Sequence, residues 1–137
     1  MIVVDASILV SFVLMEPGWE KLVDLLKNSC TVDHALKEVF NAIWRAYKRN
    51  IISIEDALLK IQALRKMVDV NVKLIDEKEL IDQAFMLALE HNITVYDALY
   101  VALALKLKEP LLTLDQAQAK IAEMLGIKLV DHHMEST

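Results

Sequence analysis

Hydrophobic and polar residues follow one another along this chain with two periodicities. Short apolar runs, rich in β-branched residues, predict four buried strands, at residues 1–4, 70–75, 110–113 and 127–130. Between and around them, apolar residues recur at helical spacing, which predicts helices over residues 7–15, 19–28, 33–49, 53–68, 76–91, 94–108 and 116–125. Strands that alternate with helices predict an α/β fold with a mainly parallel sheet, covered on both faces.

A few polar and special residues mark the ends of these elements. Ser53 and Asp56 have the spacing of a capping box at the start of one helix, and Gly126 suits the end of the last. The chain contains only two glycines and two prolines, without repeats or an internal linker. We therefore expect a single domain over residues 1–130 and a polar C-terminal tail at 131–137.

The composition is unusually apolar for 137 residues. Hydrophobic residues make up 55% of the chain, which predicts that a partner or a second copy in a symmetric dimer covers some apolar surface. The richest apolar run, residues 8–15, is too short to span a bilayer and follows no export signal. Cys30 is the single cysteine, which excludes an internal disulfide. We expect a soluble, cytoplasmic protein.

The charge of the chain does not decide whether it binds nucleic acid. A formal net charge of −5 argues against binding through a generally basic surface. If four of the acids surround a divalent cation, however, the remainder carries only about −1. Cations gather towards the C-terminal ends of two helices, where they either compensate the helix dipole or contact a substrate backbone, and Arg45 is the candidate for the second role.

Two aspartates stand at the ends of predicted strands. Asp5 follows the first strand, and Asp115 follows the strand at 110–113. The carboxyl ends of parallel strands share one edge of the sheet, which is where ligands bind in open α/β folds. Each residue also precedes a helix, and Asp is a favoured N-cap, so capping is the alternative interpretation for both.

Asp97 and Glu38 are two further acids with more than one interpretation. Thr94 and Asp97 repeat the capping-box spacing, although a carboxylate at a helix start can cap with one oxygen and face a metal with the other. Glu38 lies inside a helix, on a face that it shares with small alanines. A charge on such a close-packed face needs a partner, for which Arg45 is a candidate; a partly exposed Glu38 is the alternative.

Four segments follow one another in order: Val4-Asp5-Ala6-Ser7, Glu38-Val39-Phe40-Asn41, Tyr96-Asp97-Ala98-Leu99-Tyr100-Val101-Ala102-Leu103-Ala104 and Leu112-Thr113-Leu114-Asp115. They resemble the motifs of the PIN-domain nucleases, and the compact chain is similar to the VapC-type toxins of toxin–antitoxin pairs. The resemblance covers residues 1–130 and implies a PIN-like three-layer α/β/α fold. It also implies a metal-dependent endoribonuclease whose catalytic and metal-binding acids correspond to Asp5, Glu38, Asp97 and Asp115.

The same resemblance implies supporting residues and partners. Ser7, Asn41 and Thr113 match the polar residues that accompany the acids, whereas Gln116 and Gln118 stand where some members carry a further acid. With glutamines at these positions, the resemblance does not decide whether a second metal ion is bound. By resemblance the partners are an RNA substrate and a VapB-like antitoxin, and the broad apolar surface of the helix pair at 33–68 is a candidate for the antitoxin groove and for a homodimer contact.

The chemistry of an all-carboxylate site agrees with this interpretation. Carboxylates without converging Cys or His suit Mg²⁺ or Mn²⁺ and suit zinc poorly. Such an ion would neutralise a scissile phosphate, which the bare acids would repel, and would activate a water. The four histidines are either scattered, at His34 and His91, or adjacent in the tail, at His132 and His133, which argues against a zinc site.

Two other classes of function compete with a nuclease. The first is a PIN-fold domain retained as a binding module, which would have the fold but no metal-dependent cleavage. Among nucleases, a PIN nuclease of RNA processing is an alternative to the toxin and would have no antitoxin. Receiver and haloacid dehalogenase domains also place an Asp after their first strand. Phosphatases of the second kind have another Asp two residues on, where this chain has Ser7, and receivers have a lysine near the last strands, where it has Thr113.

Overall fold

A computed structural model of the chain describes residues 1–131. Its centre is a sheet of four strands, in the order β3-β2-β1-β4, with all neighbours parallel. The strands are β1 (Ile2–Val4), β2 (Ser29–Val32), β3 (Val72–Ile75) and β4 (Leu111–Leu112). The helices are α1 (Ala6–Val13), α2 (Leu22–Leu26), α3 (His34–Lys48), α4 (Ile54–Val70), α5 (Ile81–His91), α6 (Val95–Leu107) and α7 (Gln116–Met124), with 3₁₀ turns at Trp19–Lys21 and Glu77–Glu79.

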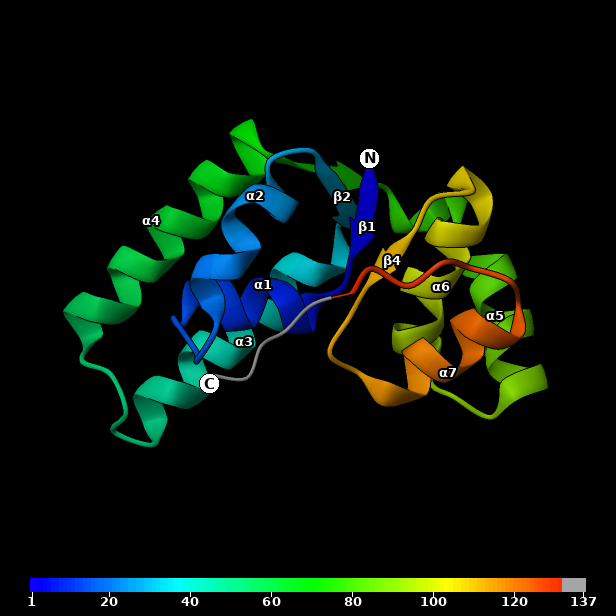
Figure 1. Cartoon of the computed structure of the whole chain (residues 1–137). Helices are drawn as coiled ribbons and strands as arrows, with labels where there is room; N and C mark the ends of the chain where they lie inside the picture. Colours follow the sequence, from blue (N-terminus) through cyan, green and yellow to red (C-terminus); the bar gives the residue numbers. More distant parts are fainter. Residues whose placement is uncertain (132–137) are drawn as a thin grey trace.

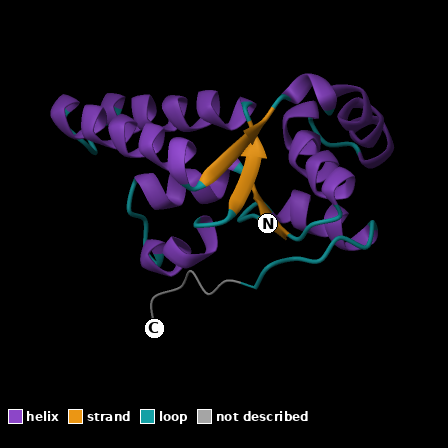
Figure 2. Cartoon of the chain, turned by 90° about the horizontal axis from the view of Figure 1, so that it is seen from above, coloured by secondary structure: helices purple, strands orange, loops and turns teal. Residues whose placement is uncertain are grey.

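The helices form a layer on each side of the sheet. Helices α1 to α4 lie on one side and α5 to α7 on the other, as Figure 1 shows and as the view from above in Figure 2 confirms. Parallel strands need crossover connections, and here each crossover carries helices that cover a face. The predicted three-layer α/β/α architecture with a short parallel sheet is therefore confirmed.

Helix α6 is the main buried helix of the molecule. Its seven consecutive residues from Ala98 to Ala104 are all buried, because β1, β2 and β4 pack on one side of the helix and α5 and α7 on the other. A helix that is apolar on all sides has no stable solvated face, so this position is dictated by its sequence. The burial holds the N-terminal turn of α6, which carries Asp97, in a fixed place relative to the sheet.

Strand β2 was missed by the hydrophobic pattern. Its residues Ser29, Cys30, Thr31 and Val32 are all buried in the interior of the sheet, although two of the four carry hydroxyls. Each hydroxyl finds a nearby carbonyl: Ser29 donates to Leu26 O at 2.9 Å and Thr31 to Val4 O at 2.6 Å. Because buried hydroxyls paired in this way lose little on folding, a strand of this kind leaves no apolar run in the sequence.

The predicted strand at residues 127–130 is wrong as a full strand. This segment makes one parallel bridge, between Leu129 and Leu111, with hydrogen bonds from Leu111 N to Lys128 O and from Val130 N to Leu111 O, both of 2.9 Å. Strand β4 is only two residues long, so it offers no further partners for pairing. The helix predicted over residues 19–28 is likewise shorter, because it is divided into a 3₁₀ turn and α2.

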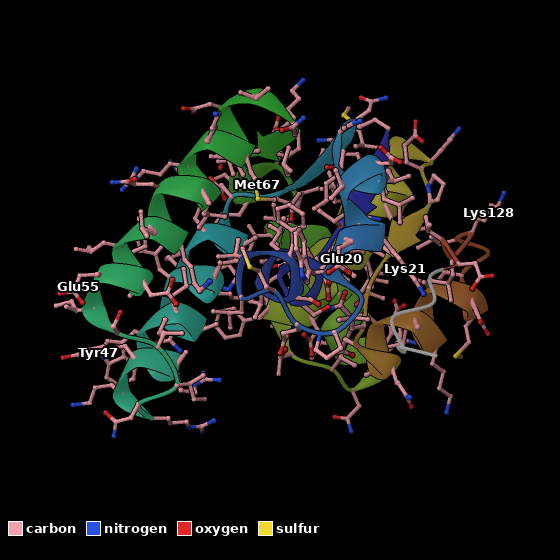
Figure 3. The ribbon with its side chains drawn as sticks, turned by 60° about the vertical axis from the view of Figure 1, so that its left-hand side comes forward. Glu20, Lys21, Tyr47, Glu55, Met67 and Lys128 are labelled. Atoms are coloured by element: carbon pink, nitrogen blue, oxygen red, sulfur yellow. The ribbon has the colours of Figure 1, made fainter. Side chains whose placement is uncertain are left out.

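Several helix caps agree with the sequence. The Ser53 hydroxyl accepts from Asp56 N at 3.1 Å, and Gly126 follows α7 with a positive φ of 78°, where a side chain would be strained. Met67 packs inward from α4, whereas Tyr47 lies exposed near the junction of α3 and α4 (Figure 3). No helix within residues 1–131 has the length and apolar character needed to cross a membrane.

Candidate active site

The carboxylate of Asp5 lies at the end of β1 and is almost wholly buried. It is 2% exposed, and each of its oxygens has a hydroxyl partner at 2.6 Å: Ser7 donates to Oδ1 and Thr113 to Oδ2. Oδ1 also accepts from Ile8 N at 3.3 Å and so caps α1. The capping interpretation of Asp5 is thus correct, and the same contacts fix its carboxylate at the edge of the sheet.

Ser7 and Thr113 connect Asp5 to the loop after β4. The Ser7 hydroxyl accepts from Leu114 N at 3.0 Å, and the Thr113 hydroxyl accepts from Asp115 N at 2.9 Å. Asp115 then caps α7, because its Oδ1 accepts from Gln118 N at 2.9 Å. The ends of two neighbouring strands therefore hold two aspartates in one hydrogen-bonded network, as the position of both acids after parallel strands predicted.

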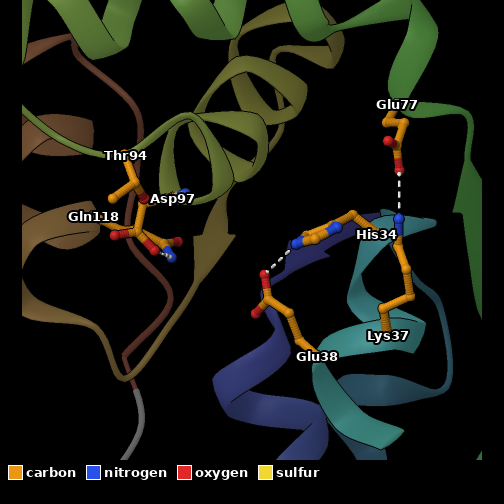
Figure 4. Close-up of polar contacts among 7 residues, drawn as sticks. All are labelled: His34, Lys37, Glu38, Glu77, Thr94, Asp97 and Gln118. Atoms are coloured by element: carbon orange, nitrogen blue, oxygen red, sulfur yellow. Dashed lines mark hydrogen bonds and ion pairs between the residues drawn. The ribbon is translucent and has the colours of Figure 1, made fainter. Parts of the chain in front are cut away.

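Asp97 joins this network through Gln118, which the sequence motifs placed where a further acid can stand and for which no contact was predicted. The Gln118 side chain is buried, and its Nε2 donates to Asp97 Oδ1 at 3.4 Å (Figure 4). Its Oε1 has no hydrogen-bond partner among the described residues. The Thr94 hydroxyl accepts from Asp97 N at 3.2 Å and so caps α6, while the Asp97 carboxylate contacts Gln118.

Glu38 reaches the site from α3, but its partner is not the one predicted. Its Oε1 lies 2.9 Å from Nε2 of His34, one turn earlier on the same helix (Figure 4). Arg45 lines the same pocket yet is exposed and makes no ion pair with Glu38. Four residues is one helical turn, so an i,i+4 pair brings the imidazole directly over the carboxylate, whereas Arg45 is two turns away.

The four predicted acids line one open pocket of about 400 Å³. Its lining comes from α1, α3, the start of α6 and the start of α7, and consists of Asp5, Ala6, Ser7, Val10, Glu16, Glu38, Asn41, Ala42, Arg45, Asp97, Leu114, Asp115 and Gln118. Thr113 lies beneath, hydrogen-bonded to Asp5. Residues far apart in the sequence are thus brought together, including the supporting residues Ser7 and Asn41.

Burial and mutual repulsion make the charged forms of Asp5, Glu38 and Asp97 unfavourable. Burial raises the pKa of Asp5 and of Asp97, and the neighbouring Asp115 raises both further. Burial, with smaller contributions from Asp5 and Asp97, raises the pKa of Glu38 from 4.5 to about 7. Burial raises the pKa of the Tyr100 hydroxyl, and the nearby Glu38 raises it further. A bound cation would relieve this repulsion.

The donor set suits a hard divalent cation. As the side chains lie, no three Asp, Glu, His or Cys residues within residues 1–131 enclose a common metal position. Mg²⁺ does not require such a cage, since it binds through one or two carboxylates, keeps several waters and accepts substrate phosphate oxygens. The pocket offers carboxylate oxygens and the unpaired Gln118 Oε1, so its residues fit Mg²⁺ or Mn²⁺.

Comparison with known proteins identifies the family. The model of the family described as "PIN domain" matches residues 2–124, which is nearly the whole chain. This chain belongs to the PIN domain family. The PIN fold and the family that the four sequence motifs suggested are thereby confirmed.

Named relatives of this PIN domain are close in length to the chain. Ribonuclease VapC3 of Pyrobaculum aerophilum is 35% identical over 122 residues, which cover 87% of this chain and 92% of the relative. Ribonuclease VapC1 of Mycobacterium tuberculosis is 40% identical over 121 residues, covering 85% and 87%. The crystal structure of PAE2754 from Pyrobaculum aerophilum has a TM-score of 0.67, at 23% identity and over 87% of this chain and 84% of that one. At that identity the structural likeness concerns the fold alone.

The raised pKa of Glu38 predicts how the stability of the metal-free PIN domain depends on pH. Between pH 4.5 and about 7 the folded protein holds a proton that the unfolded chain has lost. The free energy of unfolding therefore falls as pH rises through this window. We expect chemical denaturation in EDTA to show this fall in the parent and a smaller one in Glu38→Gln. Glu79→Gln, outside the pocket, is the control, and equal slopes for the parent and Glu38→Gln would contradict the prediction.

Proposed function

We propose that this PIN domain is a metal-dependent endoribonuclease and the toxin of a VapBC-type toxin–antitoxin pair. The observation that carries the proposal is the pocket itself, where four separate segments each supply one carboxylate. Two relatives that align over most of their own length bear the name ribonuclease VapC, which supports RNA as the substrate. We further propose that the protein acts in the cytoplasm.

Each acid has a defined part in this proposal. Asp5, Glu38, Asp97 and Asp115 would hold Mg²⁺ or Mn²⁺, which supplies charge neutralisation of the phosphate and a more acidic bound water. The chain itself supplies the positioning. Ser7 and Thr113 fix both oxygens of Asp5, and Gln118 fixes one oxygen of Asp97.

The test of the activity is cleavage of labelled RNA by the purified protein. We expect cuts within single-stranded or hairpin RNA in Mg²⁺ or Mn²⁺, and weaker or no cleavage of DNA of the same sequence. Glu38→Gln and Asp97→Asn are expected to bind RNA and to cut it slowly. An intact, folded protein that binds RNA or a partner protein and never cuts would instead identify a binding module.

Arg45 is the proposed contact to the RNA backbone, because it is an exposed cation on the lining of the acidic pocket. Arg45→Ala should weaken RNA binding and reduce the salt slope, log Kd against log salt, by about 0.7, the value for one phosphate contact on a single strand. Lys48→Ala, on the same helix but outside the pocket, is the matched control. Equal salt slopes for Arg45→Ala and the parent would remove Arg45 from the substrate site.

Exposed apolar side chains support the proposed protein partners. Along α3 and α4 they are Trp44, Tyr47, Ile54, Leu58 and Leu59, and along α5 they are Ile81, Phe85, Met86 and Leu89. Surfaces of this kind mark contact sites, so we propose an antitoxin and a homodimer as their occupants. Light scattering of the purified chain tests the dimer. The antitoxin is tested by looking for a small upstream gene that encodes a DNA-binding protein, and by measuring whether that protein binds this chain.

The His132-His133 pair lies outside the described residues.

A further inference from the structure

The His34 side chain lies between α3, to which it belongs, and α6, two of the helices that line the pocket. Its Nε2 lies 2.9 Å from Glu38 Oε1, and its ring stacks on Tyr96, with 4.8 Å between ring centroids and 19° between planes. Tyr96 immediately precedes Asp97 on α6. One imidazole thus contacts the acid of α3 and the residue beside the acid of α6 (Figure 4 shows its contact with Glu38).

The surroundings of His34 favour a hydrogen bond of fixed geometry. Its side chain is 12% exposed, against 35% for that of Glu38, so water competes little for the imidazole. An imidazole with a proton on Nε2 donates a hydrogen bond to the carboxylate.

The stack limits how the imidazole can turn. Tyr96 covers one face of the ring and is itself anchored in the first turn of α6. Lys37, on the same turn of α3, points instead to Glu77, with 4.0 Å between Nζ and Oε2, and is 72% exposed (Figure 4). His34, and not Lys37, is therefore the basic side chain of this turn that contacts Glu38.

We infer that His34 is a positioning residue for the cation site: held by the Tyr96 ring, its Nε2–H fixes the Glu38 carboxylate towards a divalent cation bound beside Asp97. The inference rests on the proposed function, because it requires Glu38 to bind the metal. Groups that hydrogen-bond a ligating carboxylate commonly change metal affinity or activity by about 10- to 100-fold when removed.

Two substitutions separate the hydrogen bond from the stack. His34→Gln keeps a donor that reaches Glu38 but loses the aromatic ring, and His34→Phe keeps the ring on Tyr96 but loses the donor. His91→Phe is the matched control, because His91 is another histidine near a helix end and lies outside the pocket. Circular dichroism and thermal melting establish that each variant is folded before Mn²⁺ binding is measured by titration calorimetry.

We expect His34→Phe to bind Mn²⁺ about 10- to 100-fold more weakly than the parent, and His34→Gln to remain within about 3-fold. The control His91→Phe should bind as the parent does. Under saturating Mn²⁺, His34→Phe should recover most of its cleavage rate, because the acids are still present. Two results overturn the inference: parental Mn²⁺ affinity in folded His34→Phe, or equally weakened binding in both His34 variants.

A measurement on the unaltered protein avoids any dependence on the folding of a variant. We expect Mg²⁺ to shift the imidazole NMR signals of His34 at the concentration where calorimetry detects binding, while those of His91 stay in place. Mg²⁺ that binds without moving His34 overturns the inference and leaves the proposed nuclease intact. A parent protein that binds no divalent cation overturns both.

Discussion

Asp5→Asn should reduce RNA cleavage at saturating metal by at least about 100-fold while the protein stays folded. A metal ion held by the acids supplies several kcal/mol of stabilisation to the transition state, and each 1.4 kcal/mol corresponds to a factor of ten. Asp5 lies at the centre of the candidate site, with both oxygens fixed by hydroxyls. Replacing one carboxylate oxygen with an NH2 group removes the negative charge and one metal-ligating oxygen at that position.

The same substitution should change the stability of the folded protein only slightly. Asn is as good an N-cap as Asp, so its remaining oxygen can accept from Ile8 N and Ser7 as Asp5 Oδ1 does. The change also removes a buried charge, whose cost is evident in the raised pKa of Asp5. We therefore expect a melting temperature within a few degrees of the parent. Asp5→Ala is the poorer test, because it leaves the hydroxyls of Ser7 and Thr113 without this acceptor.

The measurement is the single-turnover cleavage rate, with melting followed by circular dichroism. Asp76→Asn is the control, because Asp76 caps the 3₁₀ turn at Glu77–Glu79 through Lys78 N and lies outside the pocket. It should cut RNA at the parental rate. A folded Asp5→Asn protein that cleaves as fast as the parent would remove Asp5 from the catalytic set.

Much of the fold could be predicted because apolar periodicity reports burial directly. Helices α3 and α4 have long amphipathic patterns and α6 is a long apolar run, and each was predicted to within about two residues. Strand β2 was not, since Ser29 and Thr31 are buried by means of hydrogen bonds instead of apolar side chains. The segment at residues 127–130 has the pattern of a strand, but pairing depends on the length of its neighbour, β4, which a local pattern does not contain.

The site was predicted as a set of acids but not as a network. Chain position after a strand or at a helix start pointed to the aspartates, and the structure places them with Glu38 in one pocket. Gln118 was placed where some family members carry a further acid, but its contact with Asp97 was not predicted, and His34 was not expected in the site. Gln118 differs from any other buried polar residue only by its contact with Asp97, and His34 only by lying one turn before Glu38. That i,i+4 spacing was the one signal available in the sequence.

Capping a helix and lining the pocket are compatible roles for the aspartates. Asp5 and Asp115 each cap a helix with Oδ1, and Asp97 lies in the first turn of α6. The N-termini of α1, α6 and α7 therefore meet at the pocket. Their partial positive charges stabilise carboxylates that burial and repulsion disfavour. Such an arrangement lets three acids stay close together before any cation binds.

Removal of divalent metal should abolish cleavage and weaken RNA binding. Without a cation the pocket presents five acids, the four predicted ones and Glu16, so its negative charge repels phosphate. We expect no detectable cleavage in excess EDTA, and recovery when Mg²⁺ or Mn²⁺ is added back. Zn²⁺, which favours Cys and His ligands, should restore activity poorly.

Metal should also stabilise the folded protein through the same acids. A ligand at 100 times its dissociation constant adds about 2.7 kcal/mol to the free energy of unfolding when it binds only the folded state. This gain should be larger at pH 8 than at pH 5.5, because protonated Glu38 competes with the cation at the lower pH. Asp5→Asn, which has lost a ligand, should gain less than the parent at either pH. Cleavage that persists in EDTA would show that these acids act without a cation. Equal metal stabilisation of the parent and Asp5→Asn would show that Asp5 does not bind the metal.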